Sequence, residues 1–269
     1  MNKRRGPTMR HVETVRSFAE IDVAARSIVL CDLDGCLISG RHVHEGARAF
    51  VDACGDRLWI VSNNSSDTAG TLAARLDELG VSVDAGRILL AGEESVRRLA
   101  DDPQAKAALV YADAPLRALA TSLGIADSSD VPEVLLLGRD SRFSLELAEE
   151  IASHIVDGAV LWATNLDLTH PTAHGRPVPE TGALVAAIEA CTGPLSVKSI
   201  GKPSSDLIEI ALERSGADRG QALFVGDNDA TDGVAARAAG IDFLRILHPA
   251  IAPKLSIASH LNGRESVSC

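Results

Sequence analysis

Two aspartates follow the first strongly apolar segment of the chain, in the run Val29-Leu30-Cys31-Asp32-Leu33-Asp34. Residues i and i+2 of an extended chain point to the same side, so the two carboxylates are expected to lie together. Like charges this close destabilise each other unless a cation lies between them, and oxygen ligands suit Mg²⁺. The pair therefore indicates a magnesium site, although a turn or a helix cap would also explain these two residues taken alone.

Three further polar segments stand where an apolar strand ends or a helix begins. The run Ser62-Asn63-Asn64-Ser65 follows an apolar strand, and its hydroxyl and backbone N–H groups could hold phosphate oxygens, as could those of an ordinary turn. Gly201-Lys202-Pro203 places a positive charge before a helix and is uninformative by itself. The acidic loop from Gly226 to Asp232 carries three carboxylates directly after a buried strand, which favours a bound cation.

The elements that must position these side chains are predicted by short apolar runs that alternate with segments of helical period from Ser27 to Leu247. This alternation is typical of an α/β fold with a largely parallel sheet. Most of the runs are apolar throughout, so the strands are expected to be buried on both faces. The predicted strands are Ser27–Cys31, Leu58–Val61, Ile88–Ala91, Ala108–Tyr111, Glu133–Leu137, Val160–Ala163, Ala222–Val225 and Phe243–Ile246.

Three helices can be predicted between these strands. The spacing of leucines indicates a helix over 71–79, and Gly80 follows it at the position of a C-terminal cap. A second helix opens at Pro203 and stops at Gly216, and a third covers about 182–191. The chain has no internal repeat or long linker, so a second domain is expected to be an insertion with short hinges.

The composition limits the classes of partner and the compartment. Lys+Arg 26 against Asp+Glu 37 gives a net charge of −11, which argues against a surface for nucleic acid or anionic membranes. Aromatic residues make up only 3%, so a base-stacking platform is not expected. The five cysteines lack paired spacing, and the sequence shows neither a signal peptide nor the roughly 18 consecutive apolar residues of a membrane span. These features predict a cytoplasmic protein with reduced thiols.

The order of the polar segments closely resembles the four motifs of the haloacid dehalogenase (HAD) superfamily of phosphotransferases. The matching residues are Asp32-Leu33-Asp34, Ser62, Lys202, and Gly226-Asp227 with Asp232. Finer features look like the p-nitrophenylphosphatase or NagD-like branch, namely Ser62-Asn63-Asn64-Ser65, Ala163-Thr164-Asn165-Leu166-Asp167 with Pro171, Gly201-Lys202-Pro203-Ser204 and Thr231-Asp232. The resemblance covers about Ile21 to Pro249, and it implies a Rossmann-like parallel-sheet core with an inserted α/β cap domain.

The distance between the second and third motifs locates the insertion. About 140 residues separate Ser62 from Lys202, far too many for a loop. We expect a cap over 84–180 that closes over the carboxyl edge of the core sheet, excludes water and selects the leaving group. The predicted core then comprises 21–83 and 181–262, with tails at 1–20 and 263–269.

The resemblance implies a role for each motif residue. Asp32 would attack phosphorus and form an aspartyl-phosphate, and Asp34 would be the general acid for the leaving alcohol and then the base for water. The implied cofactor is Mg²⁺, held by a carboxylate oxygen of Asp32, the backbone carbonyl of Asp34 and the carboxylate of Asp227. Asp232 would complete this metal site by orienting a water ligand.

The resemblance also implies how the phosphate is held. Ser62 and the backbone of Asn63, with Asn64 beside them, would bind the phosphoryl oxygens, and Lys202 would supply positive charge against Asp32 and the phosphate. A further group is expected near the junction of cap and core, where a solvated loop would equally explain the histidine. This group consists of Asn165, Asp167 and His170.

The resulting prediction is a Mg²⁺-dependent hydrolase of small phosphomonoesters such as phosphoglycolate, glycerol phosphate, p-nitrophenyl phosphate or pyridoxal phosphate. Asp34 argues against a dehalogenase, which lacks the second aspartate of the first motif. A phosphomutase or other phosphotransferase on the same core stays open as an alternative, as does a catalytically silent phosphate-binding protein. A homodimer formed through the cap is a further hypothesis.

Several positions depart from the family pattern near the expected entrance to the site. Ile38 stands where an aromatic residue is common, Ser66-Asp67 where a basic residue is common, and Ala230 where a larger or charged one is common. The resemblance therefore does not determine the substrate contacts at the entrance. His42 and His44 could mimic a metal-binding pair, but no third ligand is near them in the sequence, so zinc is not predicted.

Overall fold

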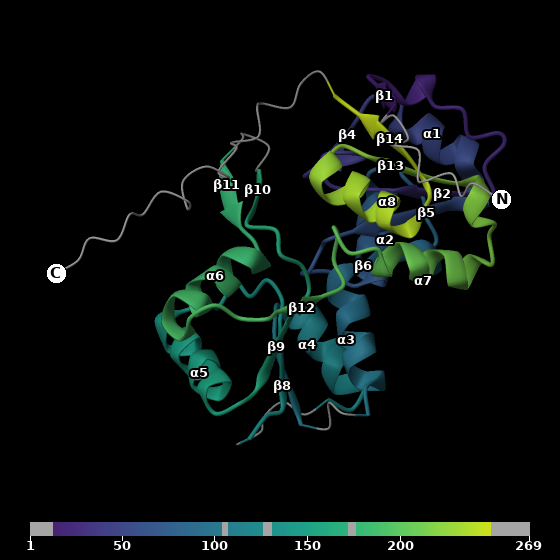
Figure 1. Ribbon diagram of the computed structural model, residues 1–269. Helices are drawn as coiled ribbons and strands as arrows, with labels where there is room; N and C mark the ends of the chain where they lie inside the picture. Colours follow the sequence, from purple (N-terminus) through teal and green to yellow (C-terminus); the bar gives the residue numbers. More distant parts are fainter. Residues whose placement is uncertain (1–12, 104–106, 126–130, 172–175, 249–269) are drawn as a thin grey trace, which may run out of the picture.

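The computed structural model describes residues 13–103, 107–125, 131–171 and 176–248, and contains two parallel sheets with helices on both faces (Figure 1). The chain therefore has the α/β fold that its alternating pattern predicts. The strands are β1 (Glu13–Val15), β2 (Ile28–Cys31), β3 (Ile38–Ser39), β4 (His42–Val43), β5 (Leu58–Ser62), β6 (Ile88–Leu90), β7 (Ala108–Tyr111), β8 (Val134–Leu137), β9 (Val160–Ala163), β10 (Thr169–Pro171), β11 (Pro177–Pro179), β12 (Lys198–Ser199), β13 (Ala222–Gly226) and β14 (Asp242–Ile246). The helices are α1 (Ala47–Cys54), α2 (Ala69–Glu78), α3 (Ala91–Asp101), α4 (Ala114–Ser122), α5 (Leu145–Val156), α6 (Thr181–Thr192), α7 (Asp206–Ser215) and α8 (Val234–Ala239).

The larger sheet has six parallel strands in the order β1-β14-β13-β2-β5-β6. Every residue of the central strands β2, β5 and β13 is buried, as expected for strands covered on both faces. Apolar side chains of α1 and α2 pack on one face, and those of α7 and α8 on the other. Because all six strands run in the same direction, their carboxyl ends meet at one edge.

The smaller sheet has four parallel strands in the order β12-β9-β8-β7. Helices α3 and α4 cover one face, and α5 and α6 cover the other. In Figure 1 this unit lies below the larger sheet, with α5 and α6 to the left of its strands and α3 and α4 to the right. The chain enters the unit directly after β6 and leaves it after β12, so both connections are short.

The eight predicted strands are confirmed, each with ends within one residue of the predicted ones. The three predicted helices correspond to α2, α6 and α7, and Gly80 and Gly216 both follow their helices with positive φ. The smaller sheet does not begin and end at the predicted cap boundaries, 84 and 180. Strand β6, which follows residue 84, belongs to the larger sheet, and strand β12, which follows residue 180, belongs to the smaller one. The division into a core and a cap remains a proposal.

The prediction of a tail over residues 1–20 does not hold for residues 13–20, which are part of the fold, and residues 1–12 lie outside the described residues. Strand β1 pairs in parallel with β14 and forms an edge of the larger sheet, and Phe18 is buried in the core. The pattern of apolar residues in the sequence did not predict this strand, because the strand is three residues long and only Val15 is buried. The predicted extension of the core over 249–262 and the tail at 263–269 lie outside the described residues.

Two short antiparallel hairpins complete the fold. The first pairs β3 with β4 and follows the first motif, and the second pairs β10 with β11 and projects from the smaller unit toward the level of the larger sheet (Figure 1). Cys31, Cys36, Cys54 and Cys191 are free thiols, and Cys269 lies outside the described residues. Among the helices that the structure describes, none combines the length and the apolar character that crossing a membrane requires.

Candidate active site

Three predicted site residues lie at the carboxyl ends of adjacent strands of the larger sheet. Asp32 directly follows β2, Ser62 is the last residue of β5, and Asp227 directly follows β13. The backbone N–H of Asp32 donates to the carbonyl of Val225 at 2.9 Å, so the register of the sheet extends to the first motif residue. Parallel pairing thus brings together side chains that lie up to 195 positions apart in the chain.

A glycine allows the turn after Asp34 to approach the acidic loop. Gly35 has φ +89°, a left-handed conformation that other residues rarely adopt. A Cβ atom at Gly35 would lie 2.7 Å from Oδ2 of Asp227, so a side chain there would clash with that carboxylate. The glycine of Asp32-Leu33-Asp34-Gly35 therefore keeps the first and fourth motifs in contact.

Lys202 bridges two of the predicted site carboxylates. Its Nζ donates to Oδ1 of Asp32 at 2.6 Å and to Oδ1 of Asp232 at 2.7 Å, and its side chain is only 3% exposed. Burial alone would lower the pKa of Lys202, but the two carboxylates outweigh it and hold this pKa well above its usual value. The lysine is therefore a fixed ammonium charge.

The carboxylates around Lys202 fit a divalent cation. One oxygen from each of Asp32, Asp227 and Asp232 lies within 4.8 Å of the others, and all three residues are buried. Three carboxylates and one ammonium leave two negative charges, and an all-oxygen donor set suits Mg²⁺. Burial raises the pKa of Asp32, and the carboxylates of Asp232 and Asp227 add to the rise while Lys202 opposes it. A bound cation would relieve this repulsion between the carboxylates.

The other carboxylate of the first motif, Asp34, has a different environment. It is exposed to solvent, yet so much protein surrounds it that burial raises its pKa above the usual value. The positive charges of Arg75, His170 and Lys202 oppose this rise. A reachable carboxyl group with a raised pKa can hold a proton and deliver it to a bound ligand, as a general acid must.

The loop after Ser62 is shaped by the side chain of Asn64. The Asn64 Oδ1 accepts the backbone N–H groups of Ser66 and Asp67, both at 2.9 Å, and its Nδ2 donates to Asp67 at 2.9 Å. The backbone N–H of Asn64 donates to the Ser62 hydroxyl at 3.1 Å, so that hydroxyl can still donate its own proton. The predicted phosphate contact of Asn64 stays a prediction, and in this structure its amide orders the loop.

Asn63 ties the Ser62 loop to Lys202 and to the chain that leaves β9. Its Oδ1 accepts the backbone N–H of Lys202 at 2.7 Å, and its Nδ2 donates to the Lys202 carbonyl at 2.8 Å and to Asp167 at 2.9 Å. Asn165 in turn donates to the backbone carbonyl of Asn63 at 2.8 Å. The structure therefore brings the predicted junction residues Asn165 and Asp167 into one network with the second and third motifs.

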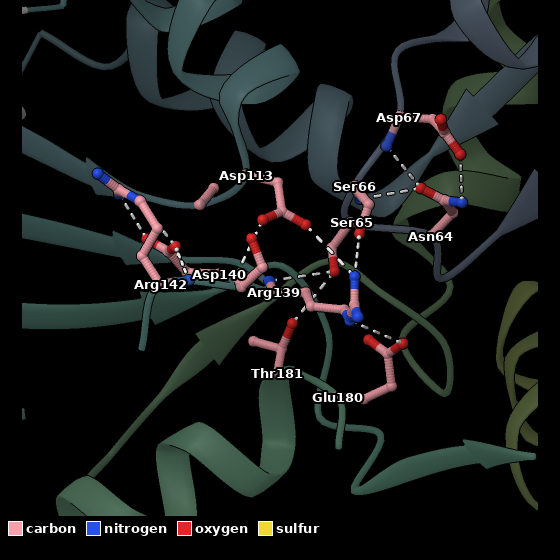
Figure 2. Close-up of polar contacts among 12 residues, drawn as sticks. Asn64, Ser65, Ser66, Asp67, Asp113, Arg139, Asp140, Arg142, Glu180 and Thr181 are labelled. Atoms are coloured by element: carbon pink, nitrogen blue, oxygen red, sulfur yellow. Dashed lines mark hydrogen bonds and ion pairs between the residues drawn. The ribbon is translucent and has the colours of Figure 1, made fainter. Parts of the chain in front are cut away.

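His170 lies on the hairpin strand β10 and hydrogen-bonds through Nδ1 to Glu180. That bond raises the pKa of His170, and the nearby carboxylate of Asp34 adds to the rise. Arg139, which follows β8, contacts the loop after β5 (Figure 2). Its guanidinium is 3.4 Å from the Ser66 hydroxyl and 3.9 Å from Glu180. The smaller unit thus contributes charged side chains beside the predicted site.

Sequence reasoning missed two cationic residues of this region, Arg75 and Arg139. Arg139 follows the predicted strand Glu133–Leu137 after a single glycine. Polar residues that follow predicted strands were selected as site candidates in the core, and the same criterion would have selected Arg139. Arg75 flanks the leucines of the predicted helix over 71–79, a position that gave no signal of a site. Both are oriented by tertiary packing that a single sequence does not reveal.

Comparison with known proteins agrees with this geometry. Residues 29–126 match the family model of haloacid dehalogenase-like hydrolases, and residues 199–249 match a HAD-hydrolase-like model. Chronophin of Mus musculus is 32% identical over 240 residues, which cover 83% of this chain and 82% of chronophin. The structure of glycerol phosphate phosphatase from Mycobacterium tuberculosis in complex with magnesium superposes with a TM-score of 0.76 at 29% identity, covering 87% of this chain and 70% of that one. For NagD from Escherichia coli K-12 the TM-score is 0.75 at 27% identity, with 83% and 88% covered.

These similarities span both sheets and all four motifs. The residues of the motifs converge at one edge of the larger sheet, around a buried lysine and three carboxylates. With chronophin 32% identical over more than four-fifths of both proteins, the chain belongs to the haloacid dehalogenase-like hydrolases, and within them to the NagD-like branch.

Proposed function

We propose that this protein hydrolyses small phosphate monoesters with Mg²⁺ as cofactor, through a phosphorylated Asp32. The observation that carries the proposal is the buried arrangement of Asp32, Lys202 and Asp232, with the exposed carboxyl of Asp34 two residues from Asp32. A nucleophile, a fixed positive charge and a separate proton donor are the groups that phosphoryl transfer to water requires.

The magnesium ion would be held by the carboxylates of Asp32 and Asp227 and by the backbone carbonyl of Asp34. Asp232 would orient a neighbouring group and would not bind the ion directly. Both oxygens of Asp232 are engaged, one with Lys202 and the other with the backbone N–H of Asn228 at 3.0 Å, so Asp232 is suited to orienting a neighbour. When bound, Mg²⁺ supplies positive charge that neutralises the carboxylates and the phosphate. The related glycerol phosphate phosphatase of Mycobacterium tuberculosis is known in complex with magnesium.

The first half of the proposed reaction transfers the phosphoryl group to the enzyme. A carboxylate oxygen of Asp32 forms a bond to phosphorus as the bond to the leaving oxygen breaks, and Asp34 donates its proton to that oxygen. The Ser62 hydroxyl and the backbone N–H of Asn63 hold the phosphoryl oxygens, and the Lys202 ammonium stabilises their charge. Asn63 keeps Lys202 in place through its two bonds to that residue's backbone.

The second half returns the enzyme to its starting state. Asp34, now a carboxylate, accepts a proton from a water molecule whose oxygen attacks the phosphorus of phospho-Asp32. Inorganic phosphate leaves, and Asp34 is protonated again for the next cycle. The raised pKa of Asp34, caused by burial, suits a group that must both give and take this proton.

The two sheets correspond, in this proposal, to a catalytic core and a cap. The smaller unit contacts the Ser62 loop through Arg139, whose backbone N–H donates to the Ser65 hydroxyl at 3.2 Å (Figure 2). The Ser65 hydroxyl is also 3.2 Å from that of Thr181 at the start of α6. These contacts support a cap that closes over the carboxyl edge, where it would exclude water and select the leaving group.

The substrate is a small phosphorylated metabolite. Relatives include a D-glycerol 3-phosphate phosphatase, a dihydroxyacetone phosphatase and a ribonucleotide monophosphatase. The net charge of −11 supports a protein that binds neither nucleic acid nor anionic membranes. A location in the cytoplasm and a homodimer formed through the cap remain parts of the proposal, and light scattering would test the dimer.

Phosphate release from a panel of phosphomonoesters, with and without Mg²⁺, tests the proposed function. We expect release that needs Mg²⁺ and is abolished by a chelator. Asp227→Asn removes one carboxylate of the metal site, so its half-saturating Mg²⁺ concentration should rise by at least about tenfold. Absence of release from every ester by folded, Mg²⁺-loaded protein would contradict the proposal.

A further inference from the structure

The exposed carboxyl of Asp34 stands on a tight turn that follows β2. Within this turn the backbone N–H of Gly35 donates to the carbonyl of Ile38 at 2.8 Å, and the N–H of Ile38 donates to the carbonyl of Leu33 at 3.0 Å. Cys36, in the middle of the turn, is fully buried. Because these bonds join residues on both sides of Asp34, the place of its carboxyl depends on how the turn is held against the rest of the fold.

A histidine from the far end of the described chain holds this turn. His248 lies two residues after β14, and its Nε2 is 2.7 Å from the backbone carbonyl oxygen of Cys36. A carbonyl oxygen only accepts, so Nε2 carries the hydrogen and the imidazole is the donor. The carbonyl of a buried residue needs such a donor to replace the water that it loses on folding. The segment after β14 is thereby bonded to the turn that carries Asp34.

The ring of His248 is itself held in one orientation. It stacks on the ring of His44, with centroids 3.8 Å apart and planes 3° apart, and its centroid is 5.5 Å from that of the Phe18 ring. His44 is buried, its Nε2 is 3.0 Å from the Ser39 hydroxyl, and its backbone N–H donates to the carbonyl of Leu37 at 3.0 Å. A closely packed ring has little freedom to turn, so the donor of His248 stays directed at the Cys36 carbonyl.

We propose that His248 is a positioning residue for the general acid, and that it acts by fixing the turn on which Asp34 stands. The inference rests on the proposed function and adds to it a residue outside the four motifs. A proton passes between groups only within hydrogen-bond reach, so a small shift of the turn slows the steps in which Asp34 gives or takes a proton. Asp32 directly follows β2 and pairs with the buried Lys202, so the nucleophile should keep its place when the bond from His248 is lost.

Two aromatic esters can distinguish misplacement of Asp34 from a general loss of structure. The p-nitrophenolate ion leaves without needing a proton, whereas the more basic phenolate of phenyl phosphate depends more strongly on the acid. The value of kcat/KM reports on the steps up to the departure of the leaving group, so the second half of the reaction does not enter it. His248→Phe keeps an aromatic ring beside His44 and removes the donor. At saturating Mg²⁺, its kcat/KM for phenyl phosphate should fall by about tenfold or more, and that for p-nitrophenyl phosphate by less than about threefold.

Further variants test the hydrogen bond itself. His248→Gln has an amide N–H that can reach the Cys36 carbonyl, so its kcat/KM for phenyl phosphate should lie within about threefold of the wild type. His248→Asn carries the same amide on a shorter side chain, so it should behave like His248→Phe. His154→Phe, which changes a histidine on α5 of the smaller unit, is the matched control and should hydrolyse both esters at the wild-type rate.

Three results would overturn the inference. Equal losses of kcat/KM on both esters in His248→Phe would assign the histidine a purely structural role, and wild-type values on both would show that the turn keeps its place without the bond. If His248→Phe does not fold, the comparison of His248→Gln with His248→Asn decides, and equal values of kcat/KM for phenyl phosphate in these two variants would be the third contradictory result. Absence of turnover of both esters by the folded, Mg²⁺-loaded wild type would overturn the proposed function itself, and this inference with it.

Discussion

Two groups of charges lie in and around the candidate active site, and they differ in how the protein holds them. The buried centre consists of Asp32, Asp227, Asp232 and Lys202. Asp32 and Asp227 directly follow strands of the larger sheet, Asp232 lies in the segment after β13, and Lys202 follows β12 of the smaller sheet, with its side chain 3% exposed. The outer ring, Arg75, Arg139, His170 and Glu180, comes from a helix, a hairpin and the smaller unit, and its three cations are 32–46% exposed.

This difference separates catalysis from substrate choice. Charges removed from water interact strongly, so the buried centre can hold a nucleophile and a phosphoryl group in fixed positions. Charges near solvent interact weakly and contribute little to stability, so residues of the outer ring can vary without loss of the fold. The comparison predicts that substitutions in the buried centre affect turnover and stability strongly, and that substitutions in the outer ring affect stability little.

Replacement of the nucleophile should have the largest effect. Asp32→Asn keeps the shape of the side chain but removes the attacking carboxylate, so kcat for phosphate release should fall by about 10⁴-fold or more. Circular dichroism should show a folded variant. A variant that keeps a tenth of the wild-type rate would contradict the assignment of Asp32.

Loss of the central ammonium should reduce stability as well as activity. Lys202→Ala leaves the buried carboxylates of Asp32 and Asp232 uncompensated, and breaking such a pair costs about 3–5 kcal/mol. Urea unfolding without Mg²⁺ measures the change. Lys198→Ala, which removes an exposed lysine over the Trp162 ring, is the control and should cost less than about 1 kcal/mol. Equal losses of unfolding free energy in Lys202→Ala and Lys198→Ala would contradict the predicted difference between buried and exposed charges.

Arg139 tests the outer ring in the same way. Arg139→Met removes side-chain contacts of 3.3 Å to Asp113, 3.4 Å to Ser66 and 3.9 Å to Glu180. Because the arginine is 32% exposed, the free energy of unfolding should fall by less than about 1 kcal/mol. A loss as large as that of Lys202→Ala would show that the two groups of charges are not held differently.

The smallest expected effect depends on pH and concerns His170. Its hydrogen bond to Glu180 raises the pKa of His170 above the value in the unfolded chain, about 6.5. The folded state therefore binds this proton more tightly, and the resulting stability is present below pH 6.5 and lost as the pH rises through the raised pKa. Since His170 is 46% exposed, His170→Gln should lower the free energy of unfolding by at most about 1 kcal/mol at pH 6.

The control for His170→Gln is the same measurement at pH 9. Once the pH exceeds the raised pKa, the histidine is neutral in both the folded and the unfolded state, so the difference between variant and wild type should be smaller at pH 9 than at pH 6. A difference that does not change with pH would show that His170 acts through packing and not through its charge.

Much of the fold could be predicted from the sequence because its strands are buried on both faces. Runs such as Leu58–Val61 and Ala222–Val225 are continuous and apolar, so the ends of these strands could be predicted from the sequence to within one residue. The hairpin of β10 and β11 could not be predicted, since its strands contain Pro171, Pro177 and Pro179, and proline is unfavourable in most strand positions. Such elements depend on contacts with the rest of the fold and not on local pattern.

The candidate site could be predicted where strand direction decides position. Asp32, Ser62 and Asp227 follow strands that run the same way, so their meeting at one edge was expected. The bridge from Lys202 to Asp232 and the loop-ordering role of Asn64 could not be derived, because they depend on side-chain directions in loops. Arg75 was missed for a related reason, since its contacts are set by how α2 packs on the sheet.

The most direct test of the account is to trap the phosphorylated enzyme. In Asp34→Asn with p-nitrophenyl phosphate, the leaving group departs without needing a proton, but the base for the second step is absent. We predict a rapid release of about one p-nitrophenolate per enzyme, followed by slow turnover, with one phosphoryl group found on the peptide that contains Asp32. Continued turnover without a phosphoryl group on Asp32, or a phosphoryl group on another residue, would contradict the proposed mechanism.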